Sequence, residues 1–259
     1  MIVTTSSRPD NQLIHTAKEA ANYLNSSFIM RNKQAIEVMK TSLNDNILVF
    51  GKNRIELHVV KNKDPLFFHP NSAMFRLKRL IRGESDTFLE ACQLKSGDSF
   101  LDCTLGLASD SIIASYRVGE EGYIQGIEAS KNIAYIVKMG LTSWNTDLTE
   151  LNEAMKRIRV ISTDHLAYLK TCEDKSFDIV YFDPMFEESI EESVGLSPLK
   201  SVAVYKELGK EAIEEAKRVA KKRVVLKDHW KSSRFEEHGF LVSIRKSAKF
   251  HYGVIEISE

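Results

Sequence analysis

The chain has 259 residues, enough for one large domain or for a main domain with a smaller companion. It carries 36 basic and 36 acidic residues, and this balance excludes a global electrostatic attraction to nucleic acid or to anionic membranes, so any such affinity must come from local patches. The hydrophobic content of 43% is ample for a globular core, yet no apolar run approaches the roughly 20 residues that span a bilayer.

The first 62 residues are expected to form a small α/β domain of their own. Its predicted elements, in chain order, are a strand at 1–5, a helix at 11–23, a strand at 27–30, a helix at 35–43 and strands at 47–50 and 54–60. The last two strands flank Gly51-Lys52-Asn53, a turn signal that is typical of a β-hairpin. Residues 63–97 are expected to be a linker, and they contain a basic helix-like segment at 74–82.

From residue 98 to residue 259, strand and helix patterns alternate, which is typical of a parallel sheet covered by helices. The predicted strands lie at 99–103, 122–127, 157–161, 177–182 and 223–226. Helices are predicted at 109–117, after the N-cap residue Ser130, at 165–169 after Asp164, and at 202–220. The segments 240–245 and 251–257 are predicted to form a hairpin. The predicted fold class is therefore α/β, with a mostly parallel sheet and a C-terminal antiparallel hairpin.

The stretch from Phe177 to Phe186 carries the clearest functional pattern. A buried strand at 177–182 must stop at Asp183-Pro184, because proline has no amide hydrogen and cannot continue a central strand. Open parallel sheets bind ligands at the carboxyl ends of their strands, where this turn is expected to lie. There the Asp183 carboxylate and the Pro184 carbonyl can accept the two hydrogens of a planar amine while Phe186 stacks on its ring. We therefore expect group transfer to an amine, with Asp183, Pro184 and Phe186 as catalytic residues.

Acidic residues also follow three other strands of the predicted sheet. Asp102 and Asp110 flank Gly106 after the first strand, while Glu128 ends the second strand and Asp164 follows the third. A glycine at such a turn lets a ligand approach the backbone closely. Glu128 stands where doubly wound folds bind both ribose hydroxyls, and Asp164 can meet an adenine amino group. These residues are expected to line one crevice for a cofactor.

The loop around Gly106 argues against two common classes of cofactor. Gly106 is followed by Leu107 and Ala108, so the G-x-G-x-x-G pattern of dinucleotide sites is absent, and the chain has no G-x-x-x-x-G-K-[ST] loop for ATP. The carboxylates of Asp102 and Asp110 would repel a pyrophosphate but suit a cationic ligand such as a sulfonium. The residues therefore favour S-adenosylmethionine over NAD or ATP.

The chain resembles the class I S-adenosylmethionine-dependent methyltransferases, and within them the RsmJ-like family of small-subunit ribosomal RNA guanine-N2 methyltransferases. The resemblance covers roughly residues 45–257, and its main segments are 102–110 (DCTLGLASD), 126–128 (GIE), 183–186 (DPMF) and 223–227 (RVVLK). It implies a Rossmann-like sheet, S-adenosylmethionine as cofactor and methylation of an exocyclic amino group in ribosomal RNA.

The resemblance also implies roles for individual residues. Besides Asp102 and Gly106, the cofactor contacts would fall on Ser109, Asp110, Glu128, Ala129, Asp164, His165 and Asp183. Met185 and Lys227 lie in matching segments and are expected to contact the substrate. The chain departs from the family at Ala108, where glycine is frequent, and at 228–230, where the lysine is commonly followed by Arg-Pro. The second departure concerns residues that could choose the substrate.

Ribosomal RNA or the small ribosomal subunit is the expected partner. Arg76, Arg79 and Arg82 lie with Lys78 and Phe75 just before the main domain, and further basic clusters lie at 217–223 and 245–249. Such clusters neutralise phosphates, and aromatic rings among them stack on exposed bases. An acidic run at 187–192 opposes RNA binding unless its side chains point away. Two alternatives stay open: a methyltransferase for a small molecule or a protein, and a non-catalytic ribosome-assembly factor.

Cysteine and metal chemistry are not expected. Cys92, Cys103 and Cys172 are far apart, none of them sits at the Asp-Pro turn, and the histidines lack metal-ligand spacing. The first ten residues lack the apolar core of a signal peptide. We therefore expect a cytoplasmic protein with neither a metal nor a membrane partner. The sequence leaves the oligomeric state open.

Overall fold

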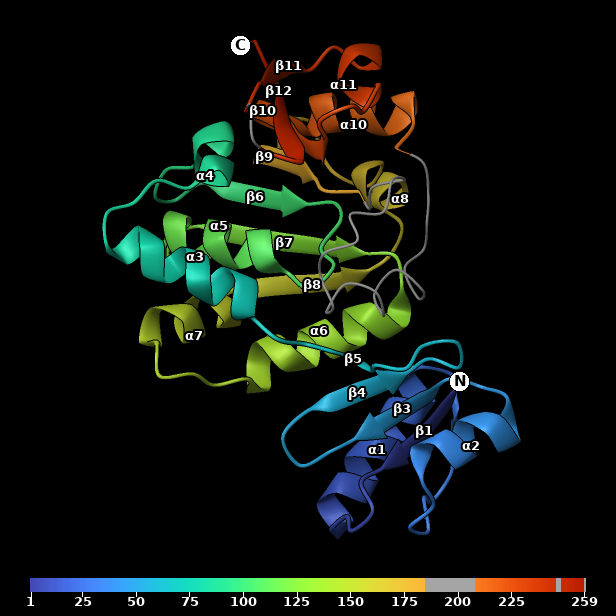
Figure 1. Cartoon of the computed structure of the whole chain (residues 1–259). Coiled ribbons are helices and arrows are strands. Elements are labelled where there is room, and N and C mark those ends of the chain that lie inside the picture. Colours follow the sequence, from blue (N-terminus) through green and yellow to red (C-terminus); the bar gives the residue numbers. More distant parts are fainter. Residues whose placement is uncertain (185–207, 246–247, 259) are drawn as a thin grey trace.

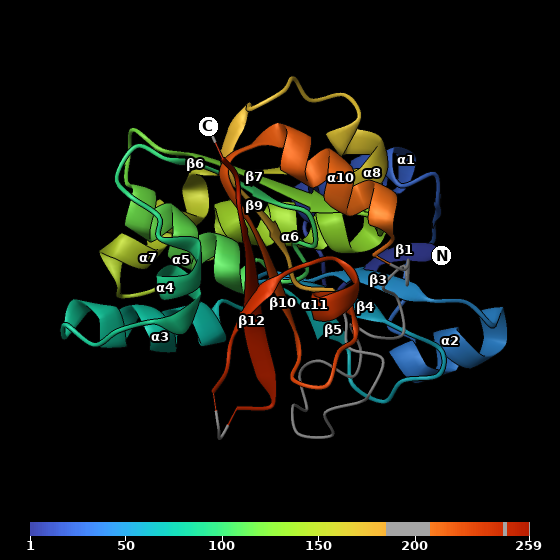
Figure 2. The same cartoon turned by 90° about the horizontal axis from the view of Figure 1, so that it is seen from above.

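The computed structural model describes residues 1–184, 208–245 and 248–258. These residues form a seven-stranded and a five-stranded sheet, each with helices packed on it (Figures 1 and 2). The five-stranded sheet, blue in Figure 1, is built from the N-terminal part of the chain and lies below the larger sheet in that view.

The seven-stranded sheet has the order β11-β12-β10-β9-β6-β7-β8. Its strands are β6 (Ser99–Asp102), β7 (Tyr123–Glu128), β8 (Ile158–Ser162), β9 (Phe177–Phe182), β10 (Ala220–His229), β11 (Leu241–Ser243) and β12 (Phe250–Glu256). Strands β6 to β10 pair in parallel, whereas β12 pairs antiparallel with both β10 and β11. The predicted Rossmann-like sheet with a C-terminal antiparallel hairpin is confirmed.

Helices cover both faces of this sheet, and each layer encloses an apolar cluster. One layer consists of α3 (Asn71–Ile81), α4 (Thr87–Cys92), α5 (Ser109–Val118), α6 (Lys131–Ser143) and α7 (Thr149–Lys156). The other consists of α8 (His165–Leu169), α10 (Lys210–Val219) and α11 (Arg234–Glu237). The buried strands between the two layers are apolar on both faces, as expected of a covered parallel sheet.

The five-stranded sheet has the order β2-β1-β3-β4-β5, with β1 parallel to β2 and β3 and the other pairs antiparallel. Its elements are β1 (Ile2–Thr5), α1 (Asn11–Tyr23), β2 (Ser27–Phe28), α2 (Ile36–Leu43), β3 (Ile47–Phe50), β4 (Ile55–His58) and β5 (Leu66–Phe67). A hydrogen bond of 3.0 Å from Gly51 N to Arg54 O closes the predicted hairpin turn. Strand β5 lies beyond residue 62, where we expected this unit to end.

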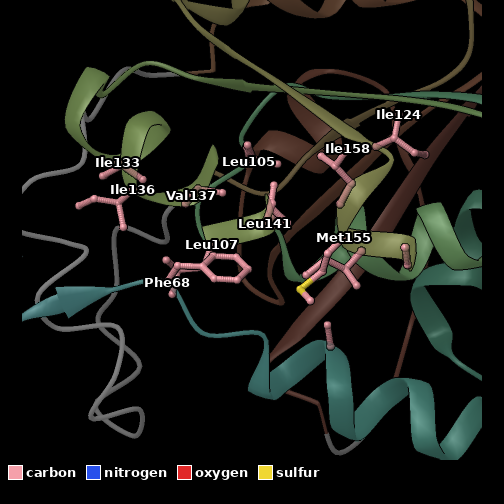
Figure 3. Packing of buried hydrophobic residues seen from close by; sticks show 14 of the residues in the cluster. Phe68, Leu105, Leu107, Ile124, Ile133, Ile136, Val137, Leu141, Met155 and Ile158 are labelled. Carbon is pink, nitrogen blue, oxygen red and sulfur yellow. The ribbon is translucent and has the colours of Figure 1, made fainter. Parts of the chain in front are cut away.

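The N-terminal unit packs against α6, the helix that follows β7. Phe68 is 3% exposed and belongs to the same apolar cluster as Val137 and Leu141 of α6 (Figure 3). Gly140 permits this contact, because a Cβ there would lie 2.2 Å from the Phe68 Cγ atom. Tyr135 of α6 adds ring contacts to the N-terminal unit, with ring centroids 5.6 Å from Tyr23 and 6.3 Å from Phe50. The two units therefore share one core.

Two C-terminal elements differ from the predicted bounds. Strand β10 runs from Ala220 to His229, three residues longer at each end than the predicted 223–226. Of the helix predicted at 202–220, the structure shows α10 at Lys210–Val219, and residues 202–207 lie outside the described part. Within the described residues, no helix is both long enough and apolar enough to cross a membrane.

Candidate active site

Four neighbouring strands of the larger sheet lead to acidic residues at one edge. Asp102 and Glu128 are the last residues of β6 and β7, and Asp164 and Asp183 closely follow β8 and β9. The four strands are adjacent in the order β9-β6-β7-β8 and run parallel, so these residues share the carboxyl edge of the sheet. This is the edge at which open α/β sheets bind ligands.

Glu128 links the loop after β6 to the loop after β7. Its Oε2 accepts a hydrogen bond from Gly106 N at 3.2 Å, and its Oε1 accepts one from Ser130 N at 2.8 Å. The side chain is buried, and this burial raises the pKa of Glu128. Each oxygen keeps a lone pair for a further donor, so the carboxylate can also accept two hydroxyl groups of a ligand.

Asp102 shapes the turn into α5 from inside the protein. Its carboxylate accepts hydrogen bonds from Ser111 Oγ at 2.6 Å and Thr104 N at 3.0 Å. The residue is 2% exposed, and burial raises the pKa of Asp102 to about 7. The turn itself uses the left-handed backbone region, with φ of 50° at Gly106 and 62° at Ala108. Alanine is more strained than glycine in this backbone region, because glycine has no Cβ.

The other predicted cofactor residues lie at the starts of helices. Asp164 caps α8 by accepting a hydrogen bond of 3.0 Å from a backbone N–H of its first turn. His165 is buried, and its ring meets the Phe182 ring edge-on with centroids 5.8 Å apart. Ser109 begins α5 and is half-buried, while Ala129, between β7 and α6, is exposed. The structure thus brings the predicted cofactor residues to the loops of one sheet edge.

Asp183 ends a chain of alternating charges that we call the charge network: Asp86, Arg76, Asp110, Lys227 and Asp183. Lys227 Nζ donates to Asp183 Oδ2 at 2.6 Å and to Asp110 Oδ2 at 3.2 Å. Arg76 Nη1 donates to Asp110 Oδ1 at 2.5 Å, and its Nε and Nη2 donate to the two Asp86 oxygens at 2.8 and 2.9 Å. Its three acids and two bases leave it with one net negative charge.

Two uncharged side chains fix this network to the sheet, and we did not anticipate either from the sequence. The Tyr181 hydroxyl donates to Asp110 Oδ2 at 2.8 Å, and Tyr181 itself is fully buried. Thr104 Oγ1 accepts a hydrogen bond of 2.6 Å from Asp183 N, which ties the end of β9 to the loop after β6. The sequence signal for the first of these was a tyrosine in a strand expected to be buried, because a buried phenol needs a hydrogen-bond partner.

The network sets the charge of its members. Burial alone would raise the pKa of Asp110, but Lys227 and Arg76 outweigh it and hold that pKa well below the usual range. Burial would lower the pKa of Lys227, but Asp110 and Asp183 raise it above the usual value. For Asp183, burial dominates over the attraction of Lys227, and together with the nearby Asp110 charge it raises the pKa to about 6. Asp110 is therefore the firmly anionic carboxylate and Asp183 the one that can take up a proton.

The predicted substrate residues fall into two groups. Arg76 and Lys227 belong to the charge network, with side chains 20% and 18% exposed. Arg79 and Arg82 instead lie at the end of α3, where Arg79 Nε donates to Glu84 at 2.7 Å from a largely exposed position. Only the second group is placed to reach a phosphate without breaking buried ion pairs.

The Asp-Pro turn lies partly outside the described residues, and the second basic cluster lies away from it. Pro184 is half-buried, whereas Met185 and Phe186 lie outside the described residues. In the cluster at 217–223, Lys222 bridges Asp98 and Asp178, and Arg223 pairs with other protein groups. These two residues lie at the opposite edge of the sheet from Asp183. Across the described ranges, no group of three His, Cys, Asp or Glu residues is placed to hold a metal ion.

Residues 31–251 match a family model described as "Putative SAM-dependent methyltransferase". The chain belongs to this family. Over 257 residues the methyltransferase is 50% identical to "Uncharacterized protein YpiP" of Bacillus subtilis, which covers 99% of this chain and 100% of the relative.

Other similarities are more distant. The chain is 30% identical over 167 residues to Ribosomal RNA small subunit methyltransferase J of Acinetobacter baumannii, and the match spans 58% of this chain and 57% of the relative. The crystal structure of the SAM-dependent methyltransferase NGO1261 from Neisseria gonorrhoeae superposes with a TM-score of 0.64 at 16% identity, covering 99% of this chain and 96% of the other. The structural match shows that the fold is shared.

The methyltransferase uses S-adenosylmethionine as its cofactor, and the groups at the sheet edge fit this molecule. Its sulfonium and amino groups are cationic, and its ribose and adenine offer hydroxyl and amino hydrogens. The edge presents carboxylates as acceptors, of which Glu128 is held between the Gly106 and Ser130 amides. The left-handed turn at Gly106 exposes backbone rather than a side chain to the crevice. The chemistry of the acceptor set therefore matches that of the cofactor.

Proposed function

We propose that this methyltransferase methylates an exocyclic amino group of a base in small-subunit ribosomal RNA, with guanine N2 as the target atom. The observation that carries the proposal is the hydrogen bonding of the Asp183 carboxylate at the carboxyl edge of the sheet. Lys227 binds its Oδ2, and among the described residues its Oδ1 has no hydrogen-bond partner. The similarity to relatives named Ribosomal RNA small subunit methyltransferase J supports RNA as the substrate.

In this proposal the Asp-Pro turn positions the amine. Asp183 Oδ1 and the Pro184 carbonyl accept its two hydrogens, which directs the nitrogen lone pair toward the donor. When bound, S-adenosylmethionine supplies a methyl carbon attached to a positively charged sulfur. The nitrogen lone pair would form the new bond to that carbon, and the carbon–sulfur bond would break with its electron pair going to sulfur. Positioning and a preset dipole supply most of the acceleration.

The amine must also lose a proton, because nitrogen gains a fourth substituent when the methyl group arrives. Asp183 accepts this proton and passes it to water. Its pKa of about 6 lies close enough to neutrality for both steps. Lys227 keeps its own proton throughout, since Asp110 and Asp183 raise its pKa.

Four other residues are assigned to the donor. Glu128 accepts the ribose hydroxyls and Asp164 the adenine amino group, as their places at the ends of β7 and β8 allow. Ala129 and His165 follow these two acids directly and line the same crevice. Asp102 acts on the loop, because it is 2% exposed and accepts hydrogen bonds from Thr104 and Ser111. Asp110 acts in the charge network, because its oxygens already accept hydrogen bonds from Arg76, Tyr181 and Lys227.

Exposed aromatic rings and cations offer a path for the RNA. Phe75 on α3 is 65% exposed, Arg79 lies on the same helix and Arg82 is its C-cap residue. Trp230 is 51% exposed and follows β10, so it lies at the Asp183 edge of the sheet. Stacking on such a ring contributes about 1–3 kcal/mol per base in single-stranded RNA. Trp230 is our candidate for holding a base that is turned out of its stack.

The experiment is a comparison of ribosomal RNA from cells with and without this protein, with nucleotide mapping by mass spectrometry. We expect one methyl group to be missing from small-subunit RNA in cells that lack the protein. The wild-type gene should restore it and an Asp183→Ala variant should not. An identical set of methylated nucleotides in both strains would refute the RNA assignment and leave a small molecule or a protein as substrate.

A further inference from the structure

We propose that Lys227 is a positioning residue for methyl transfer: it holds Asp183 Oδ2 so that Oδ1 faces the amine, and Asp110, Arg76 and Tyr181 hold Lys227 in place. This inference rests on the proposed function, in which Asp183 accepts the amine hydrogen. It gives Lys227 a role other than the substrate contact expected from the sequence, and it gives Arg76 a role other than phosphate binding.

Two contacts fix the orientation of Asp183. Lys227 Nζ lies 2.6 Å from Asp183 Oδ2, while Thr104 Oγ1 accepts the backbone N–H of the same aspartate at 2.6 Å. Backbone and carboxylate are thus both fixed. A carboxylate with one oxygen bound to a cation cannot rotate freely about its last torsion, so the other oxygen keeps one direction. The Asp183 side chain remains 27% exposed, which leaves this second oxygen room for a substrate.

Asp110 and its partners hold Lys227 in place. Its ammonium is shared with Asp110, whose two oxygens also receive the Tyr181 hydroxyl at 2.8 Å and Arg76 at 2.5 Å. Asp86 accepts hydrogen bonds from Nε and Nη2 of Arg76 and also caps the N-terminus of α4. Lys227 therefore cannot swing away from Asp183 without leaving Asp110 short of a cation in a buried site, which is costly.

The charges around Asp183 are mostly negative. The titratable and charged groups that act on Asp183 or share the charge network are Lys227 and Asp228 of β10, Tyr181 of β9, Asp110 of α5, Asp102 of β6, Tyr252 of β12, Arg76 of α3 and Asp86, the N-cap of α4. Asp228 already has its own partners in Arg234 and Ser232. Among the described residues, Lys227 is the cation that touches Asp183 directly. Without it, the remaining negative charges would favour protonated Asp183.

The strand offers a matched control at its other end. Lys222 also lies on β10 and also bridges two acids, at 2.6 Å from Asp98 and 3.0 Å from Asp178. It lies at the edge opposite Asp183, so a Lys222→Met variant loses a two-acid bridge on the same strand but away from the site. A defect caused only by loss of such a bridge would appear in both variants.

The test is the pH dependence of kcat/KM for Lys227→Met, Lys227→Arg, Arg76→Met and Lys222→Met, with small ribosomal subunits lacking the methyl group as substrate. In wild type the acid limb should reflect Asp183 near pH 6. Lys227→Met should move this limb up by more than one pH unit. A limb at about 7.5 would leave Asp183 anionic in roughly a quarter of molecules at pH 7 instead of roughly nine-tenths, a loss of about fourfold that disappears near pH 9.

The other variants should follow in order. Lys227→Arg should keep the limb of wild type, Arg76→Met should shift it in the same direction by less, and Lys222→Met should leave it unchanged. Binding of S-adenosylhomocysteine, measured by calorimetry, should be equal in all of them. A Lys227→Met profile that falls by one constant factor at every pH, or not at all, would overturn the proposal.

Two further outcomes distinguish a failure of this inference from a failure of the proposed function. If Lys227→Met shows no turnover at any pH, Arg76→Met decides, because it retains Lys227, and an unshifted limb there overturns the proposal. An Asp183→Asn variant that retains turnover would instead overturn the proposed function itself. An inactive Asp183→Asn variant together with an unshifted limb in the Lys227 and Arg76 variants would overturn this inference alone.

Discussion

The contact between Gly140 and Phe68 allows a sharp prediction about how the N-terminal unit is held. A Cβ at position 140 would lie 2.2 to 2.4 Å from the Cγ, Cδ1 and Cβ atoms of Phe68. Because the Phe68 Cβ is among these atoms, rotation of the ring cannot relieve the clash and the backbone must move. Overpacking of this kind costs about 1–3 kcal/mol, and we take the upper value of about 3. Alanine gains about 1 kcal/mol in helix propensity over glycine.

Gly140→Ala should therefore lower the free energy of unfolding by about 2 kcal/mol, or the melting temperature by about 4–8 °C. Phe68→Ala should cost about 3–5 kcal/mol because it empties a buried site. In the Phe68→Ala background the clash is gone, so Gly140→Ala should become stabilising by about 1 kcal/mol. Urea unfolding of the four proteins measures this cycle. An unchanged or raised stability of Gly140→Ala alone, or simple additivity, would refute the reasoning.

Three further predictions concern the loops at the sheet edge. Glu128→Gln should weaken S-adenosylhomocysteine binding about tenfold in calorimetry, because charge-assisted hydrogen bonds are about twice as strong as neutral ones; equal affinity would remove Glu128 from the site. Burial raises the pKa of Asp102 from 3.8 to about 7, so its protonated form stabilises the fold at low pH and this contribution is lost as pH rises toward 7. Relative to Asp102→Asn, wild type should lose about 2 kcal/mol of stability between pH 5 and pH 7; parallel curves would contradict this. Ala108→Gly should raise the free energy of unfolding by up to about 1 kcal/mol, because Ala108 has a φ of 62°; a loss of more than about 1 kcal/mol would show that the alanine is not strained.

Local signals were sufficient for much of the fold. The helix at 165–169 and the strand at 177–182 have the predicted bounds, because Asp164 caps the one and Pro184 ends the other. Turn residues and alternating patterns likewise predicted the hairpin around Gly51 and the antiparallel C-terminal pair. The carboxylates at the strand ends could be expected to lie near one another, because the carboxyl ends of parallel strands lie at the same edge of the sheet.

Long-range pairing of charges could not be read in the same way. Lys227 follows the predicted strand at 223–226, yet β10 continues to His229 because residues 227–229 pair with β12. Asp183, 44 residues away in the chain, compensates the lysine charge. Arg76 was expected to bind phosphate, but its guanidinium lies between Asp86 and Asp110, which is 34 residues away. A basic residue looks the same in the sequence whether it is exposed or belongs to a buried ion-pair network. Only the fold distinguishes these two environments.

The central claim is that the Asp183 turn presents an exocyclic amine of small-subunit ribosomal RNA to the methyl donor. The direct measurement incubates small subunits from cells lacking the protein with purified enzyme and S-adenosylmethionine carrying a deuterated methyl group, then digests the RNA and identifies the labelled nucleoside by mass spectrometry. We predict label in N2-methylguanosine with wild type and none with Asp183→Ala. Label on a ring carbon, on a ribose oxygen or in protein, or equal label with Asp183→Ala, would contradict it.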